Sequence, residues 1–263
     1  MAQRLPPART APDGSPYPDR STASFEREVR TMFTFIARHY ERFNHLATFG
    51  QDFLWRARSL WELDRFRRVP IVRALDVGCG TGEFARAVAT HYPSARVVAT
   101  DLTLEMVRRA RGAAPGGAGG ERLQFGRASA LRLPFADRSF DLVTNAFVLR
   151  NLSSLPAGLA EMRRVLRPGG VLLSLEVGEP SAAPIRAVFH AHFDHVVPLL
   201  GRAFGSEGPY RYLPESLRGL PDRPRLLAMH GEAGFSRHTA RTQSLGVVTV
   251  YLAEAGAPSE ESR

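Results

Sequence analysis

Lysine is missing from this sequence, and cysteine is nearly so. The 35 lysine-plus-arginine positions are all arginine, and Cys79 is the single thiol. One thiol excludes an intrachain disulfide and favours a cytoplasmic protein. No apolar run approaches the roughly 18 residues that a transmembrane helix needs, and the first residues lack a signal-peptide core. We therefore expect a protein that is cytoplasmic or that meets a membrane only at its surface.

Blocks of like charge are also missing, although the net charge is +9. The arginines are scattered, and no run of five basic residues occurs. A bias in the source genome explains them more simply than a nucleic-acid partner, which we do not expect. With 263 residues, of which 44% are hydrophobic, the chain can bury the core of one full domain.

The amino-terminal region divides into two parts. Residues 1–22 carry five prolines and few apolar side chains, as is typical of disorder. Residues 23–263 are expected to form a single domain. Its first part has helical periodicity, in one stripe from Val29 to Phe43 and in a second stretch from Phe53 to Phe66.

From Ala74 onward, patterns of strand and helix alternate. This alternation predicts an α/β protein with a doubly wound sheet and helices on both faces. A helix that includes Leu159 is expected to stop at Pro168-Gly169-Gly170, and Gly112–Gly120 is expected to be a flexible loop. The last two strand-like runs predict an antiparallel hairpin at the sheet edge. The first two expected strands end at Val77 and at Thr100. The others are expected at residues 123–125, 141–145, 171–177, 236–242 and 246–252.

A glycine turn follows the first of these strands. Gly78, Gly80 and Gly82 have the spacing G-x-G-x-G. The G-x-G-x-x-G pattern of dinucleotide enzymes would need a glycine at position 83, where this chain has Glu83. The carboxylates of Glu83 and Asp76 repel a pyrophosphate but suit a cation. S-adenosylmethionine, with its sulfonium and ammonium charges, therefore fits this turn better than a dinucleotide. Asp101 ends the next strand, where an acidic residue accepts hydrogen bonds from a ribose.

Further motifs carry a family resemblance, which spans about residues 29 to 250. The chain resembles the demethylmenaquinone and ubiquinone-biosynthesis C-methyltransferases, within the class I S-adenosylmethionine-dependent methyltransferases. The resemblance implies a Rossmann-like fold with an N-terminal helical lid (25–68) and a substrate lid (178–225). The motifs are Met32-Phe33, Leu133-Pro134-Phe135, Leu149-Arg150-Asn151, Arg164-Val165-Leu166-Arg167-Pro168-Gly169-Gly170 and Tyr210-Arg211-Tyr212-Leu213 with Glu215-Ser216.

The resemblance also implies a set of residues that bind S-adenosylmethionine. Two of them depart from the family pattern, because Ser129 stands where the family usually has Asp or Asn, and Ala146 where it often has a small polar residue. Cys79 is expected only to pack between the glycines. The expected cofactor residues are Asp76, Gly78, Gly80, Thr81, Gly82, Asp101, Leu102, Ser129, Ala130 and Ala146.

The implied reaction is methylation of a ring carbon next to a hydroxyl of a reduced prenylated quinone. Demethylmenaquinol is favoured over the ubiquinone precursor, and another hydroxylated aromatic or a lipid remains an alternative acceptor. Arg150 is expected to stabilise the phenolate. His195 is a candidate base, with a structural role as the competing interpretation. The expected substrate-binding residues are Tyr40, Asn44, Asn151, Tyr210 and Tyr212.

The expected partners follow from this acceptor. A prenylated substrate is taken from a membrane, and apolar residues between Phe189 and Leu200 suit a peripheral membrane contact, with core packing as the alternative. A homodimer and a non-catalytic assembly protein that keeps the cofactor site also stay open. No metal is expected at His190, His192 and His195, because methyl transfer needs none.

Overall fold

The computed structural model describes residues 23–116, 118–204, 216–217 and 219–256. The expected disordered segment 1–22 lies outside the described residues, as do Tyr210 and Tyr212.

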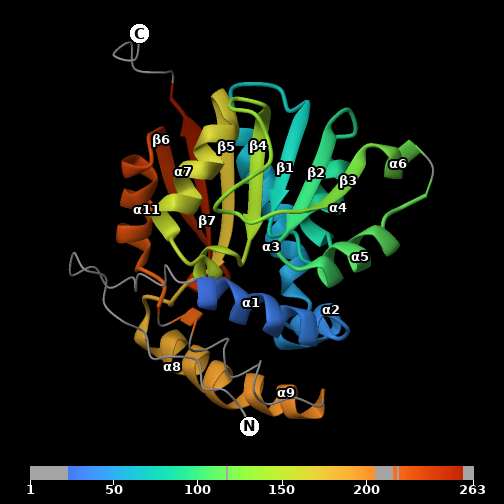
Figure 1. Ribbon diagram of the computed structural model, residues 1–263. Helices are drawn as coiled ribbons and strands as arrows, with labels where there is room; N and C mark the ends of the chain where they lie inside the picture. The colour runs from blue at the N-terminus through green and yellow to red at the C-terminus, as the bar shows by residue number, and fades with distance from the viewer. Residues whose placement is uncertain (1–22, 117, 205–215, 218, 257–263) are drawn as a thin grey trace.

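Seven strands in the described part of the chain form one sheet in the order β3-β2-β1-β4-β5-β7-β6 (Figure 1). Strands β1 to β5 are parallel, while β7 runs antiparallel between β5 and β6. The predicted doubly wound α/β fold and its edge hairpin are therefore confirmed. The strands are β1 (Arg73–Val77), β2 (Arg96–Asp101), β3 (Leu123–Arg127), β4 (Phe140–Ala146), β5 (Leu166–Val177), β6 (Phe235–Gln243) and β7 (Val248–Ala255).

Both faces of the sheet are buried under helices. Successive side chains of a strand point to opposite faces. Ala74 belongs to the core on one face and Leu75 to the core on the other, and both are fully buried. The Ala74 face is covered by α3 (Gln51–Phe66), α4 (Glu83–His91) and α5 (Leu104–Gly112). The Leu75 face is covered by α7 (Leu155–Val165) and α11 (Arg223–Glu232).

Further helices gather at the end of the sheet where the parallel strands finish (Figure 1). The gathered elements are α1 (Ala23–Ile36), α2 (Tyr40–Ala47), α8 (Ala183–Ala191), the π-helical η2 (His192–Val196) and α9 (Val197–Ala203). Side chains of Ile36, Phe43 and Val197 form a small core that packs α1 and α2 against α9. The expected apolar stripe from Val29 to Phe43 is broken at residues 37–39, so it belongs to two helices. No described helix is both long enough and apolar enough to span a bilayer.

Two local expectations differ from the structure. Helix α7 ends at Val165, and Pro168-Gly169-Gly170 lies inside β5 instead of ending the helix. The pairing of β4 with β5 jumps from Phe140–Leu166 to Leu142–Val171, so these residues bulge out of the ladder, where proline needs no partner for its nitrogen. The expected loop at Gly112–Gly120 contains the end of α5 and the start of the short α6 (Ala118–Glu121).

His230 makes the fold sensitive to acid. Its side chain is fully buried, its Nδ1 donates to the Leu226 carbonyl at 2.7 Å, and its ring stacks on Tyr251 at 5.5 Å. Burial lowers the pKa of His230 from 6.5 to about 4, against the effect of the Leu226 hydrogen bond. Between these values the unfolded chain binds a proton that the folded chain does not, so stability falls as the pH falls.

We expect His230→Phe to reduce the loss of unfolding free energy between pH 7 and pH 5 by about 2 kcal/mol, at about 1.4 kcal/mol per pKa unit. Urea unfolding of both proteins at the two pH values measures this difference. Equal losses in the wild type and the variant would contradict it.

Candidate active site

The glycine turn after β1 brings bare backbone to the carboxyl end of the sheet. Gly78 and Gly80 have φ values of +69° and +54°, in the region that glycine adopts most easily. A Cβ at Gly78 would lie 2.5 Å from a methyl carbon of Val148. The turn is held by the Cys79 amide, which donates to the Thr100 carbonyl at 2.9 Å. No side chain larger than hydrogen fits at Gly78 without displacing Val148.

Asp101 ends β2 beside this turn as an anchored pair of acceptors. Its Oδ2 accepts from the Gly80 amide at 2.9 Å, and its Oδ1 accepts from the Thr103 amide at 2.8 Å. Burial raises the pKa of Asp101, although these two amides favour the carboxylate. The Thr103 hydroxyl also hydrogen-bonds to this carboxylate, so three of its roughly four lone-pair positions are in use. At least one position stays open to a hydroxyl group of a ligand beside the glycine turn.

A cavity lies against this turn, and we call it the turn cavity. Glu26, Val29 and Phe33 of α1 lie along its wall, and the space left is about 90 Å³. Glu26, which the sequence did not single out, receives a hydrogen bond from Ser129 Oγ at 3.1 Å. Seven of the expected cofactor residues line this cavity: Gly78, Gly80, Asp101, Leu102, Ser129, Ala130 and Ala146.

The other three expected cofactor residues do not line the turn cavity. Thr81 and Gly82 lie in the turn, and Gly82 is the N-cap residue of α4. Asp76 is buried in β1, where its Oδ1 accepts from Thr144 Oγ1 at 2.7 Å. Burial raises the pKa of Asp76 to about 7, although hydrogen bonds from Thr144 and from the Ala85 backbone of α4 favour the carboxylate.

A larger cavity of about 450 Å³ adjoins the first, and we call it the apolar cavity. Tyr40 and Phe147 line both cavities, so they stand at the boundary between them. Phe49, Val188 and Leu245 line the apolar cavity and are still 77%, 70% and 76% exposed. These three residues therefore form an apolar rim where the cavity meets solvent.

Phe147 holds its boundary position in an unusual backbone conformation. Its φ is +61°, which is rare for a bulky residue. Its amide donates to the Leu175 carbonyl at 2.7 Å, and its carbonyl accepts from Asn151 Nδ2 at 3.1 Å. Strain of this kind persists where the surroundings over-determine it, often at functional sites. The sequence contains no signal for this conformation.

Two buried arginines line the apolar cavity beside Phe147. Arg150 pairs with Glu176, with 2.5 Å between Nη1 and Oε1. The guanidinium groups of Arg56 and Arg150 lie 5.9 Å and 5.6 Å from the centre of the Phe147 ring. The Nε atom of each is buried and has no hydrogen-bond partner among the described residues. Arg150 therefore lines the apolar cavity and not the turn cavity, and Glu176 already balances its charge.

The expected acceptor-site residues are divided between the two cavities. Tyr40 and Asn44 line the apolar cavity, and Asn151 lines the turn cavity. Burial raises the pKa of Tyr40, against a hydrogen bond with Asn44 and the charge of Arg150. His195 is exposed on η2 and lines neither cavity, so the structure does not bring it to the site. The histidine that does line the apolar cavity is His192.

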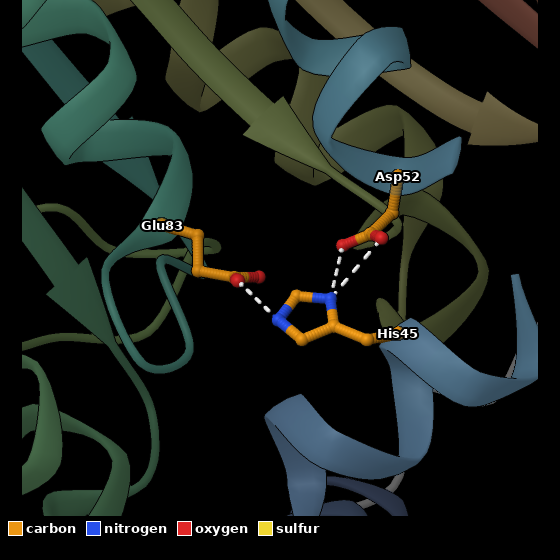
Figure 2. A group of neighbouring side chains, drawn as sticks. All are labelled: His45, Asp52 and Glu83. Carbon is orange, nitrogen blue, oxygen red and sulfur yellow. Dashed lines mark hydrogen bonds and ion pairs between the residues drawn. The ribbon is translucent and has the colours of Figure 1, made fainter. Parts of the chain in front are cut away.

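Four ionisable side chains from α2, α3 and the start of α4 form a closed ring beside the glycine turn, and we call it the charge ring. Figure 2 shows His45 between the carboxylates of Asp52 and Glu83. His45 Nδ1 lies 3.0 Å from Asp52 Oδ2, and its Nε2 lies 3.1 Å from Glu83 Oε1. Arg56 closes the ring, with Nη1 2.7 Å from Asp52 and Nη2 2.9 Å from Glu83.

The charge ring corrects one inference from the sequence. Glu83 was expected to offer its charge to a cationic ligand, but its carboxylate is occupied by Arg56 and His45 and does not line the turn cavity. The spacing of Asp52 and Arg56, four residues apart on one helix, is the only local signal for the ring. Its other contacts depend on how α2, α3 and α4 pack.

Comparison with known proteins adds a family model and several relatives. The model of the "ubiE/COQ5 methyltransferase family" matches residues 21–254. A demethylmenaquinone methyltransferase of Porphyromonas gingivalis is 38% identical over 86% of this chain and 91% of its own length. One from Deinococcus radiodurans is 39% identical over 86% and 92%. A ubiquinone/menaquinone biosynthesis C-methyltransferase of Geobacter sulfurreducens is 35% identical over 90% and 91%.

Two solved structures share the fold at low sequence identity. A Thermotoga maritima S-adenosylmethionine-dependent methyltransferase has a TM-score of 0.60 at 18% identity, covering 86% of this chain and 99% of its own. A putative methyltransferase from Haloferax volcanii, solved with its Trm112 activator, has a TM-score of 0.60 at 16% identity, covering 86% and 98%. At these identities the likeness shows the class I methyltransferase fold.

Proposed function

The chain belongs to the ubiE/COQ5 methyltransferase family, and on that premise we propose that it methylates a ring carbon of a prenylated quinol in quinone biosynthesis. Demethylmenaquinol is the acceptor we favour over the ubiquinone precursor, since the first two relatives above are demethylmenaquinone methyltransferases. The observation that carries the proposal is the pairing of the turn cavity with an adjoining apolar cavity that contains buried arginine donors.

The residues of the turn cavity fit S-adenosylmethionine, the cofactor of this family. Asp101 accepts the two ribose hydroxyls, one of them in place of the Thr103 hydroxyl. The bare backbone at Gly78 and Gly80 allows close approach, and Ala146 lies toward the boundary with the apolar cavity. When bound, the cofactor supplies an activated methyl group on a sulfonium centre.

Helix α1 acts as part of a lid in this proposal. An adenosine derivative needs more room than the about 90 Å³ that remain under Glu26, Val29 and Phe33. Outward movement of α1 would open the turn cavity, and its return would exclude water from the reaction. Residues 23–263 then work as one domain whose lid comprises 25–68 and 178–225.

The apolar cavity is the proposed place for the quinol ring. Its apolar wall suits an aromatic ring, and the unpartnered Nε donors of Arg56 and Arg150 suit ring oxygens. The exposed rim of Phe49, Val188 and Leu245 offers a path for a prenyl tail. We place the protein in the cytoplasm, with this rim against the membrane surface that holds the substrate.

Catalysis in this site rests on position and charge. Arg150 and Arg56 stabilise negative charge that develops on the ring oxygen when its proton leaves. Tyr40 and Phe147 stand between the cavities and align the acceptor carbon with the methyl donor. Asn44, which also lines the apolar cavity, holds Tyr40 by a hydrogen bond.

The test supplies methyl-labelled S-adenosylmethionine with one of three acceptors: demethylmenaquinol in phosphatidylglycerol vesicles, the demethylated ubiquinone precursor in the same vesicles, or RNA. We expect carbon-bound label in demethylmenaquinol and recovery of the protein with the vesicles on sedimentation.

The three acceptors distinguish the proposed reaction from the alternative functions. Label only in the ubiquinone precursor would change the acceptor and keep the reaction. No label in either quinol, from protein that still binds the cofactor, would overturn the proposed function. Full activity without vesicle binding would remove the membrane contact alone.

A further inference from the structure

Methylation of a quinol carbon releases one proton per turnover, which must leave a largely apolar cavity. The hydroxyl loses its proton, and its electrons shift through the ring to the carbon that forms the new C–C bond. The S–C bond breaks, and its electron pair stays on sulfur. The ring carbon then loses its hydrogen as a proton and the oxygen regains one. One proton therefore needs an acceptor and a way to solvent.

Few described groups on the wall of the apolar cavity can take up this proton. The arginines do not deprotonate at working pH, and burial raises the pKa of Tyr40, so its hydroxyl stays protonated. Asp52 and His192 remain. His192 Nε2 donates to the Ala47 carbonyl at 2.9 Å, and its ring lies against the rings of Phe49 and Phe193, which do not titrate. Asp52 is the one carboxylate among the described lining residues, and it leads outward into the charge ring.

We propose that Asp52 receives the hydroxyl proton of the acceptor and that His45 passes it to solvent, so that the charge ring is the proton exit of the active site. The proposal rests on the proposed quinol methylation. It assigns the base to residues that no sequence motif marked, in place of His195.

The exposure of the two side chains and the pKa of Asp52 favour movement of the proton from Asp52 outward to His45. Asp52 is 1% exposed, while the His45 side chain is 28% exposed. The Asp52 carboxylate accepts from Arg56, His45 and Thr48, and these contacts hold its pKa below its usual range although burial opposes them. A proton that reaches Asp52 is therefore passed on to His45 Nδ1, 3.0 Å away.

The ring also accommodates the proton on His45. An imidazolium has two N–H groups, and here each faces a carboxylate, Asp52 on one side and Glu83 on the other (Figure 2). With His45 charged, the two cations and two carboxylates of the ring balance. Other titratable or charged groups close to it are Glu41 of α2, which acts on Glu83, and Arg86 of α4, which pairs with Glu41 at 3.6 Å. Asp76 of β1 and Tyr40 of α2 feel the charge of Arg56.

The same three ligand-type residues, His45, Asp52 and Glu83, lie close enough to hold a metal ion. Arg56 argues against one, because its guanidinium already bridges Asp52 and Glu83 at 2.7 Å and 2.9 Å. A metal ion would be placed next to that fixed positive charge. The ring is therefore better suited to moving a proton than to binding a cation.

The experiment compares His45→Ala and Asp52→Asn with the wild type in single-turnover methylation of the quinol from pH 5.5 to 9. We expect losses of at least 10-fold for His45→Ala and 100-fold for Asp52→Asn at pH 7, with cofactor affinity within 2-fold of the wild type. We expect the wild-type rate to fall in acid, because an imidazolium cannot accept a proton. That acid limb should be absent from His45→Ala.

Imidazole added to His45→Ala should restore at least part of the rate, with a pH dependence that follows imidazole, which a purely structural role would not produce. The matched control is His91→Gln, since His91 forms a similar pair with Asp64 at 2.6 Å away from both cavities. It should leave the pH profile unchanged.

An unchanged pH profile without rescue in His45→Ala would overturn the exit path, as would loss of the acid limb in His192→Gln instead. If Asp52→Asn fails to fold, the rescue measurement still decides. A wild type that methylates no quinol would reject the proposed function itself, a result distinct from an active wild type with unaffected variants.

Discussion

Asp101→Ala is expected to weaken binding of S-adenosylmethionine by about 10²- to 10⁴-fold. The loss corresponds to two hydrogen bonds from ribose hydroxyls to a carboxylate, each worth about 1.5–3 kcal/mol, at about 1.4 kcal/mol per tenfold. Asp101 is fixed for this task by the Gly80 and Thr103 amides. Isothermal titration of the purified variant with the cofactor measures the change.

Folding has to be separated from binding in this variant, because the two amides lose their acceptor. Thermal unfolding without cofactor gives that control. Asp137→Ala is the matched substitution, since Asp137 is 69% exposed and lines neither cavity. A dissociation constant for Asp101→Ala within 3-fold of the wild type would show that Asp101 does not bind the ribose.

Arg150→Gln is expected to lower kcat for quinol methylation by about 10²- to 10³-fold, the usual effect of removing one group that stabilises an oxyanion. The variant also leaves Glu176, which is 1% exposed, as an unpaired buried carboxylate. Breaking a buried pair in this way costs about 3–5 kcal/mol of stability. Activity and unfolding free energy must therefore be measured together.

The double variant Arg150→Gln with Glu176→Gln separates the two effects. It removes both charges, so it should recover most of the stability while kcat stays low. Glu176→Gln alone should keep activity near the wild-type level, because Arg150 retains its charge toward the cavity. If the double variant recovered kcat together with stability, Arg150 would be a structural residue and the phenolate would need another partner.

The placement of the glycine turn beside Asp101 was predictable because both lie at the ends of strands. The glycine turn directly follows β1, and Asp101 is the last residue of β2, its parallel neighbour. Neighbouring parallel strands end at the same edge of a sheet, so their carboxyl ends meet. The position of Arg150 just after β4 placed it at that edge for the same reason.

The sequence pattern was less informative about the helices that cover this edge. The stripe from Val29 to Phe43 indicated helix correctly but not the break at residues 37–39, because apolar spacing continues across it. His195 was a candidate base because of its residue type and its place in the family pattern. The turn of η2 leaves it exposed and brings His192 to the cavity.

Local order along the chain thus accounts for the α/β alternation, the glycine turn and the acidic residue beside it, since hydrophobic period and turn chemistry act over a few residues. The packing of separate elements decides the boundary at Phe147, the pair of Arg150 with Glu176, and the charge ring. In that ring Glu83 meets His45 and Arg56 across 38 and 27 positions of sequence. Such contacts depend on where α2 and α3 lie against the start of α4, and no residue pattern within one element records that placement.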